Sequence, residues 1–302
     1  MEIMYDFKTF GQMNLDVIFK GFPHMPEAGE EVFAKQFDLQ LGGGPMLYPI
    51  LLNNLGFKTK LGTFLSDNEA SSLCINLMER IGFKDYENFN KQEANPVVVT
   101  GVFSLEHDRS FVSYNRFINE SKLSEEEVYE FLKDARVISA PIGHLGALKR
   151  LHHEGRKVVF DVGWSDSLCV ENLKPILQFV DIFSPNDREA MKMTGKETPE
   201  AALLVLKNYT EAPIVTMGEK GCIYYDNGVK SIPTVSNMKS VDTTGAGDNF
   251  IAGVVYGLLK EYSLCDCIKL GNVFAGYSTT KIGCYGAMIN KEIINCYFKP
   301  SI

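Results

Sequence analysis

Short apolar runs alternate with helix-length segments through the second half of the chain. The runs with the length and composition of buried strands cover residues 136–139, 157–161, 181–183 and 213–216. Strands separated by single helices are typical of βαβ units, so this pattern predicts a parallel sheet in an α/β fold. Two S-x-x-E capping boxes, Ser66 with Glu69 and Ser124 with Glu127, predict helices that begin near residues 67 and 125.

Two segments depart from this rhythm, at 16–39 and 97–114. In the second, the apolar runs 97–103 and 110–114 flank a polar turn around residues 107–109, which predicts a β-hairpin. We expect the two segments to form a small extra sheet that projects from the main body as a lid. No repeat or low-complexity linker interrupts the chain, so residues 1–302 are expected to form one domain with this lid.

Composition and charge exclude several classes of protein. The chain has 302 residues, of which 45% are hydrophobic, enough to bury a full core without disulfides or structural metals. Its net charge of −8, without a cluster of Lys or Arg, argues against a nucleic-acid partner. No apolar run has the length of a membrane span, and the acidic start lacks the features of a signal peptide, so we expect a cytoplasmic protein with no membrane contact.

The segment 241–250, V-D-T-T-G-A-G-D-N-F, carries the strongest chemical signal because it runs directly into a helical apolar pattern. The backbone N–H groups of Gly245, Ala246 and Gly247 are predicted to lie free at the helix start, where they form an anion hole. Asp248 then falls in the first turn, where a carboxylate can accept the proton of a substrate hydroxyl during phosphoryl transfer. The simpler alternative is a tight glycine turn with an acidic residue that complements the helix dipole.

The string D-T-x-G-A-G-D resembles the C-terminal signature of the ribokinase-like, or PfkB-type, carbohydrate kinases. Other motifs of that family are resembled in the same order: the opening G-x-x-N-x-D at 11–16, the glycine motif at 42–45, N-x-x-E at 186–189, and T-x-G-x-x-G at 216–221. The resemblance covers nearly the whole chain. It implies a three-layer α/β/α fold with a mainly parallel central sheet, and the ATP- and Mg²⁺-dependent phosphorylation of a small sugar-like molecule.

The resemblance also implies roles for individual residues. The acceptor would be bound by Asn14, Asp16, Gly42 and Gly43, with Asp248 as the base beside the anion hole of Gly245, Ala246 and Gly247. Asn186 and Glu189 would act on Mg²⁺ through its waters, because this ion gives up its hydration shell reluctantly. The nucleotide would be bound by Thr216, Gly218, Gly221, Asn272 and Gly286. Some members bind K⁺ beside the anion hole, and Asp242 and Thr244 match those positions.

Each lesser motif also fits a plain structural role. Asn14 and Asp16 could form a turn after a strand. Asn186 and Glu189 fit an N-cap with an acidic residue in the first helical turn. Gly218 and Gly221 fit an ordinary β-turn.

Two positions differ from the family pattern. The glycine motif usually ends in an asparagine that binds the sugar, and Leu47 stands there, or Tyr48 if the register shifts by one residue. Gly163 replaces the asparagine of a D-x-N motif that begins at Asp161. With these amides missing, ribose and fructose are expected to be poor acceptors. Arg116, at the end of the lid hairpin, would suit an anionic group on the acceptor, or could be a solvated charge on the lid edge.

The motifs bear on four candidate functions. The leading hypothesis is a sugar kinase that acts on a small molecule and could form a homodimer through its lid. The alternative is a catalytically silent ligand-binding or regulatory protein with the same fold. A nicotinamide-dependent dehydrogenase and a P-loop ATPase are excluded, because neither G-x-G-x-x-G after the first strand nor G-x-x-x-x-G-K-[ST] occurs.

Overall fold

The computed structural model describes residues 3–105, 109–115 and 122–301. In this part of the chain a nine-stranded sheet has the order β13-β12-β11-β10-β9-β8-β1-β4-β5. Neighbouring strands are parallel from β11 to β5, and β12 and β13 add an antiparallel edge. The strands are β1 (Tyr5–Phe10), β4 (Thr59–Thr63), β5 (Tyr86–Asn88), β8 (Ala135–Ser139), β9 (Lys157–Phe160), β10 (Ile182–Phe183), β11 (Ala212–Thr216), β12 (Cys222–Tyr225) and β13 (Val229–Ile232).

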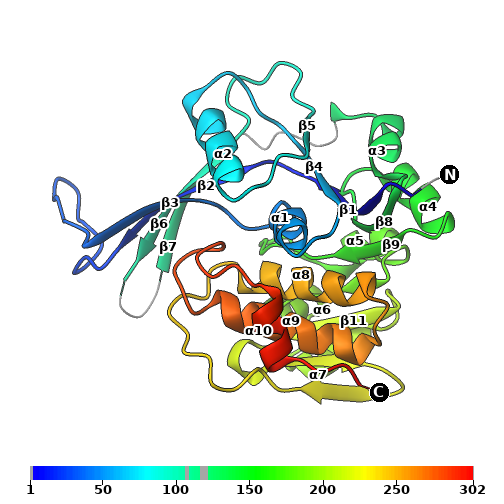
Figure 1. Ribbon diagram of the computed structural model, residues 1–302. Helices are drawn as coiled ribbons and strands as arrows, with labels where there is room; N and C mark the ends of the chain where they lie inside the picture. Colours follow the sequence, from blue (N-terminus) through cyan, green and yellow to red (C-terminus); the bar gives the residue numbers. More distant parts are fainter. Residues whose placement is uncertain (1–2, 106–108, 116–121, 302) are drawn as a thin grey trace.

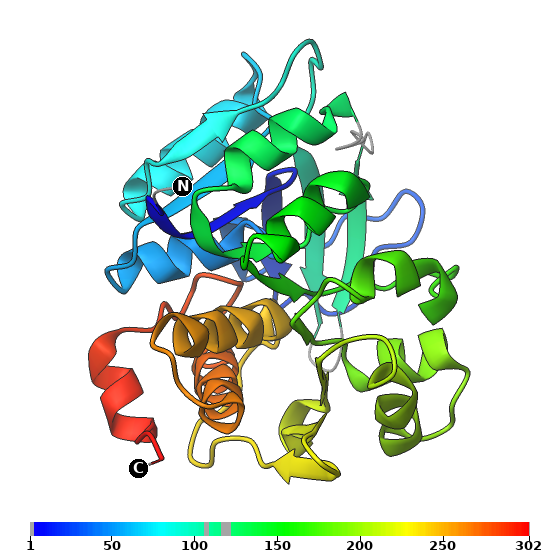
Figure 2. The same cartoon turned by 90° about the vertical axis from the view of Figure 1, so that its right-hand side faces the viewer.

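Helices cover both faces of this sheet (Figures 1 and 2). They are α1 (Leu47–Asn54), α2 (Glu69–Arg80), α3 (Glu125–Leu132), α4 (Leu145–His153), α5 (Val170–Leu177), α6 (Asp187–Thr194), α7 (Pro199–Leu206), α8 (Ala246–Leu259), α9 (Leu264–Ser278) and α10 (Lys291–Tyr297). The predicted three-layer α/β/α fold is therefore confirmed, and the strands predicted at 136–139, 157–161, 181–183 and 213–216 are β8, β9, β10 and β11.

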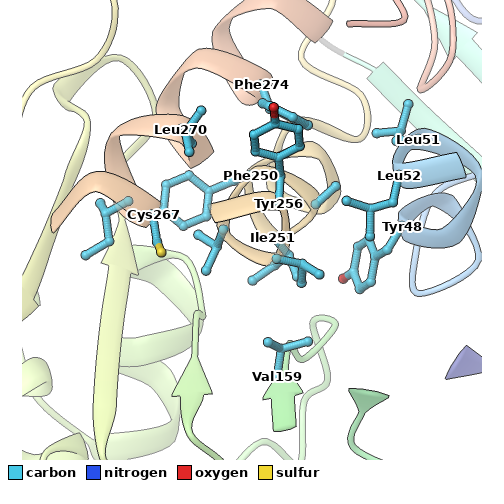
Figure 3. Packing of buried hydrophobic residues seen from close by; sticks show 14 of the residues in the cluster. Tyr48, Leu51, Leu52, Val159, Phe250, Ile251, Tyr256, Cys267, Leu270 and Phe274 are labelled. Atoms are coloured by element: carbon cyan, nitrogen blue, oxygen red, sulfur yellow. The ribbon is translucent and has the colours of Figure 1, made fainter. Parts of the chain in front are cut away.

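Alternation of side chains along the strands divides the core into two layers. Phe7 and Val137 face α1, α8 and α9, whereas Ile138 and Val158 face α3, α4 and α7. Figure 3 shows the first layer, a single cluster that includes Phe250 of α8, Phe274 of α9 and Leu52 of α1. These apolar contacts fix the start of α8 against the carboxyl ends of the strands.

The lid is a separate four-stranded sheet of order β3-β2-β6-β7 that projects from the main body (Figure 1). Its strands are β2 (Asn14–Lys20), β3 (Gln36–Leu41), β6 (Val98–Ser104) and β7 (Arg109–Tyr114). The predicted hairpin exists, since β6 and β7 pair antiparallel from Val99↔Tyr114 to Ser104↔Arg109. Both segments expected to form the lid, 16–39 and 97–114, contribute to it.

One of the two predicted capping boxes is wrong. Ser124 and Glu127 form the expected box at the start of α3. At α2, however, the N-cap is Asn68, whose side chain accepts a hydrogen bond from the Ser71 amide at 2.8 Å. Ser66 instead donates its hydroxyl proton to the carbonyl of Ala94 at 2.7 Å, so the helix begins at Glu69 rather than near residue 67. Asparagine caps as well as serine does, and a tertiary partner for Ser66 decides between them.

Within the ranges that the structure describes, no helix is both long and apolar enough to cross a bilayer.

Candidate active site

The signature segment forms the turn that starts α8. Gly245 is its N-cap and has a φ of 71°, a left-handed conformation that favours glycine. A Cβ at this position would also overlap the Cys284 side chain. Glycine is therefore required here by both the backbone and the neighbouring loop.

The three amides expected to form the anion hole are not equivalent. The Ala246 N–H donates to the carbonyl of Thr243 at 3.2 Å, so it is not free as the sequence predicted. Gly247 is exposed, and the space beside its Cα is open for at least 4 Å. The open helix start therefore centres on Gly247, where the helix dipole favours negative charge.

Asp248 lies in the first turn of α8 and meets the glycine motif of the distant segment 42–44. Its carboxylate accepts a hydrogen bond from the Gly44 amide. A Cβ on Gly43 would overlap Oδ2 of Asp248, so only glycine permits this close approach. The glycine motif thus fixes the orientation of the Asp248 carboxylate.

The lid adds Asp16 and Asn14, both from β2. Asp16 is 4% exposed, and its buried Oδ1 has no hydrogen-bond partner within the described ranges. The Asn14 side chain donates a hydrogen bond to Asp16, accepts one from the Thr100 hydroxyl at 3.1 Å, and leaves no room for a Cβ on Gly42. An unpaired buried carboxylate oxygen is costly, and a hydroxyl-bearing ligand would pair with it.

Several carboxyl groups meet here and raise one another's pKa. Burial, and then the charge of Glu189, raises the pKa of Asp248 to about 6. Burial, and then the charge of Asp248, raises the pKa of Asp16 to about 6. Burial, followed by Asp248 and Glu189, holds the pKa of Asp161 well above its ordinary value. Perturbed carboxyl groups gathered in this way are typical of functional sites.

A cavity of about 430 Å³ opens on the other side of the α8 start. Among its lining residues are those predicted for the nucleotide and the anion hole: Thr216, Gly218, Gly221, Asn272, Ala246 and Gly247. The sequence missed part of the wall, which includes Val235, Met238, Ala275 and Thr279. These residues belong to no motif, because the wall of a cavity requires suitable size and polarity rather than a fixed spacing. The size and the mixed lining suit a ligand with a flat ring and a polar end.

Some predicted cofactor residues also have structural partners. The Asn272 side chain donates to the carbonyl of Pro233 at 3.1 Å. Gly286 lies outside this cavity, in a neighbouring hollow beside Gln40 and Ile282. Gly286 therefore lies apart from the other residues that the sequence assigned to the nucleotide.

Asn186 and Glu189 form a reciprocal capping box at the start of α6. The Glu189 amide donates to the Asn186 side chain, and the Asn186 amide donates to the Glu189 carboxylate, each at 2.9 Å. Glu189 is only 6% exposed, and burial raises its pKa. Its charge contributes to the raised pKa of both Asp248 and Asp161, so Glu189 belongs to the same electrostatic cluster.

Asp242 and Thr244 join two loops beside the anion hole. Oδ1 of Asp242 accepts from the amide and the hydroxyl of Thr244, at 3.0 and 2.7 Å. Oδ2 accepts from the Gly283 amide at 2.8 Å. This carboxylate therefore ties the signature to the loop that follows α9.

Leu47 and Tyr48 are both buried at the start of α1, with exposures of 0% and 2%. Only Tyr48 has a polar group. Burial, followed by the charges of Asp161 and Asp248, holds the pKa of this phenol well above its ordinary value. Arg116 lies outside the described residues.

Asp248 thus lies beside an open helix start, between the lid and a ring-sized cavity, an arrangement that suits phosphoryl transfer. The model of the pfkB family carbohydrate kinases matches residues 6–291, so the chain belongs to this family and is a carbohydrate kinase.

Relatives agree with this assignment. The chain is 25% identical to a probable fructokinase-5 of Arabidopsis thaliana over 93% of both chains, and 25% identical to a ribokinase of Lactococcus lactis over 93% of this chain and 92% of the other. The structure of Arabidopsis thaliana ribokinase with ribose and ATP shares its fold, with a TM-score of 0.81 at 20% identity, over 99% of this chain and all of the other.

Proposed function

We propose that the protein transfers the γ-phosphoryl group of ATP to a hydroxyl of a small sugar-like acceptor, with Asp248 as the base. The observation that carries this proposal is the position of Asp248 between two sites. On one side, the adjacent residues Ala246 and Gly247 line the large cavity. On the other, Asp248 contacts Gly43, and its charge reaches Asp16 of the lid.

The chemistry follows from this placement. The acceptor oxygen attacks the γ-phosphorus as its proton moves to Asp248, and the bond from phosphorus to the leaving oxygen of ADP breaks. The start of α8 stabilises the charge on the transferring group. Asp16, with its unpaired oxygen, binds a second hydroxyl of the acceptor. The ATP assignment is supported by the related ribokinase, whose structure was determined with ribose and ATP.

The residues present fit a hydrated Mg²⁺ and a monovalent cation. Glu189 and Asn186 are engaged in a cap, so they would hold Mg²⁺ through its waters, and the ion would neutralise phosphate charge. The Asp242 carboxylate joins the signature loop to the loop at Gly283. K⁺ bound beside it would strengthen the connection between these two loops. Both ions are part of the proposal.

The test is ADP release from ATP across a panel of sugars, sugar acids, sugar phosphates and nucleosides. Asp248→Asn is the control, because it keeps a hydrogen-bond acceptor for Gly44 but cannot take the proton. We expect at least one acceptor whose turnover falls by several powers of ten in this variant. Retention of a tenth of wild-type kcat would show that Asp248 is not the base.

We also propose that two copies associate through their lids. The outer strand β7 exposes Phe111, Val112 and Tyr114, which would be covered in a dimer. Sedimentation of the protein, and of a Val112→Lys variant, tests this. A monomeric wild type, or a dimer that the variant leaves intact, would refute it.

No observation in the structure favours the catalytically silent alternative. The contact between Gly43 and Asp248 orients a carboxylate, which ligand binding without phosphoryl transfer would not require.

A further inference from the structure

Polar groups without partners gather on one face of the central sheet, at the carboxyl ends of its strands. The Oγ atoms of Thr9, Ser139 and Ser184 are buried and have no hydrogen-bond partner in the described part of the chain. Thr9 lies in β1, Ser139 ends β8, and Ser184 directly follows β10. Each lies two residues after a core residue of the α1 and α8 layer, namely Phe7, Val137 and Ile182, so all three hydroxyls face that layer.

Asp161 extends this row across β9. It lies two residues after Val159, which belongs to the same core layer. One of its oxygens accepts a hydrogen bond from the Val162 amide at 2.8 Å. Burial and the neighbouring charges of Asp248 and Glu189 favour its protonated form, which can donate as well as accept. The polar groups at the carboxyl ends of β1, β8, β9 and β10 therefore face the same core layer. Asp161 lies two residues further along its strand than Val159, the partner of Ser139.

Tyr48 covers the row from α1. Its ring packs edge-on against Phe7, with centroids 6.2 Å apart, which places it above β1. In Figure 3 the ring extends from α1 away from Leu51 and Leu52, on the side where Val159 lies. Its hydroxyl is buried without a partner, although Asp161 and Asp248 are close enough to raise its pKa. The phenol therefore stays neutral at physiological pH and has a proton to donate.

A structural role does not account for this hydroxyl. Buried hydroxyls are almost always paired, and an unpaired one destabilises the fold. Phenylalanine at position 48 would fill the same space without that cost. A tyrosine in this place, above β1 and within the electrostatic reach of Asp161 and Asp248, indicates a partner that arrives with a ligand.

We propose that Tyr48 is a specificity-determining residue, whose phenol donates a hydrogen bond to a second oxygen of the bound acceptor, directly or through one ordered water. This inference rests on the proposed phosphotransferase function. It assigns an acceptor that carries a second oxygen on the sheet side of the reacting hydroxyl, where Tyr48 lies above β1. The helix start thus contributes a donor one residue after Leu47, which lies fully buried in the core.

The test compares wild type with Tyr48→Phe, using the best acceptor and a series of analogues that each lack one hydroxyl. We expect kcat/KM for the parent acceptor to fall by about one to two powers of ten. For one analogue the loss should shrink to less than about twofold, since the partner of the phenol is already absent. The KM for ATP should not change, and the melting temperature should stay equal or rise, because an unpaired hydroxyl has been removed.

Tyr256→Phe is the matched control. Tyr256 belongs to the same core layer but packs against Phe57 at the far end of α8, with centroids 5.5 Å apart. Removal of the Tyr256 hydroxyl should leave kcat/KM for every acceptor, the KM for ATP and the melting temperature unchanged. The inference is overturned if Tyr48→Phe keeps the parent kcat/KM within twofold, or if it loses the same factor with every analogue.

A second experiment tests the role of Tyr48 even if the protein is not a phosphotransferase. If the wild type phosphorylates no compound in the panel, calorimetry measures binding of the same compounds. A compound that binds the wild type but binds Tyr48→Phe at least tenfold more weakly supports the role of Tyr48 without transfer. Equal binding, or no binding by either protein, overturns it.

Discussion

At the scale of single residues, the contact between Gly43 and Asp248 joins two motifs that lie 205 residues apart in the chain. We predict that Gly43→Ala lowers kcat by about 100-fold or more, because displacing a catalytic group by about 1 Å has an effect of that order. Gly163→Ala is the control, since a Cβ there meets nothing within 4 Å. Steady-state kinetics measures both. A Gly43→Ala enzyme within fivefold of wild type would show that this contact does not orient the base.

The raised pKa of Asp248 predicts the acid limb of the pH profile. The active form of the base is the carboxylate, so kcat/KM should fall as the pH drops through about 6, rather than near the ordinary value of 3.8. Rates from pH 4.5 to 8.5 measure this limb. Removing the charge of Glu189, a cause of the rise, should move the limb to lower pH. A limb near pH 4 in the wild type would contradict the prediction.

At the scale of secondary-structure elements, the start of α6 combines a cap with a proposed ion site. Glu189→Gln keeps the capping geometry, because glutamine serves equally in a capping box, but removes the charge. We predict an unchanged or higher melting temperature and a Mg²⁺ half-saturation at least tenfold higher.

The box at the start of α3 supplies the control. Glu127→Gln makes the same substitution in the same motif, where the glutamate is partly exposed and caps α3. Its Mg²⁺ dependence should equal that of the wild type. If Glu189→Gln also leaves the Mg²⁺ dependence unchanged, Glu189 serves only as a cap.

At the scale of the whole molecule, the cluster of Asp16, Asp161 and Asp248 destabilises the free protein at neutral pH. Each pKa is higher in the folded state than the ordinary value of 3.8. Groups with a raised folded-state pKa stabilise the fold fully below the unfolded value, and that contribution is lost as the pH rises through the folded value. We therefore expect the free energy of unfolding to decrease between about pH 4 and pH 6.5 because of these groups.

Asp248→Asn should reduce this decrease in the free energy of unfolding, because the variant has no carboxyl group to ionise at this position. A rise of the pKa from 3.8 to about 6 corresponds to about 3 kcal/mol at most, and asparagine still accepts the Gly44 hydrogen bond. The variant should unfold at a higher temperature than wild type at pH 7.5, with a smaller difference at pH 5. Calorimetric melting at both pH values measures this. An equal difference at the two values would show that ionisation of Asp248 does not control stability.

The sequence by itself determined several of the elements and the position of the proposed base. The alternation of apolar runs gave β8 to β11, the hairpin and capping-box patterns gave the lid and α3, and the signature placed Asp248 in the first turn of α8. These features depend on residues close together in the chain, or on a motif whose spacing is itself the information.

Only the tertiary structure decided which side chains meet. The distant partner of Ser66 moved the cap of α2 to Asn68, and the Ala246 amide turned back to Thr243 instead of remaining free. The raised pKa of Asp248 and the unpaired hydroxyl of Tyr48 depend on burial among groups from separate strands and helices. Burial and close packing are sums over neighbours brought together by folding, so no local pattern of residues specifies them.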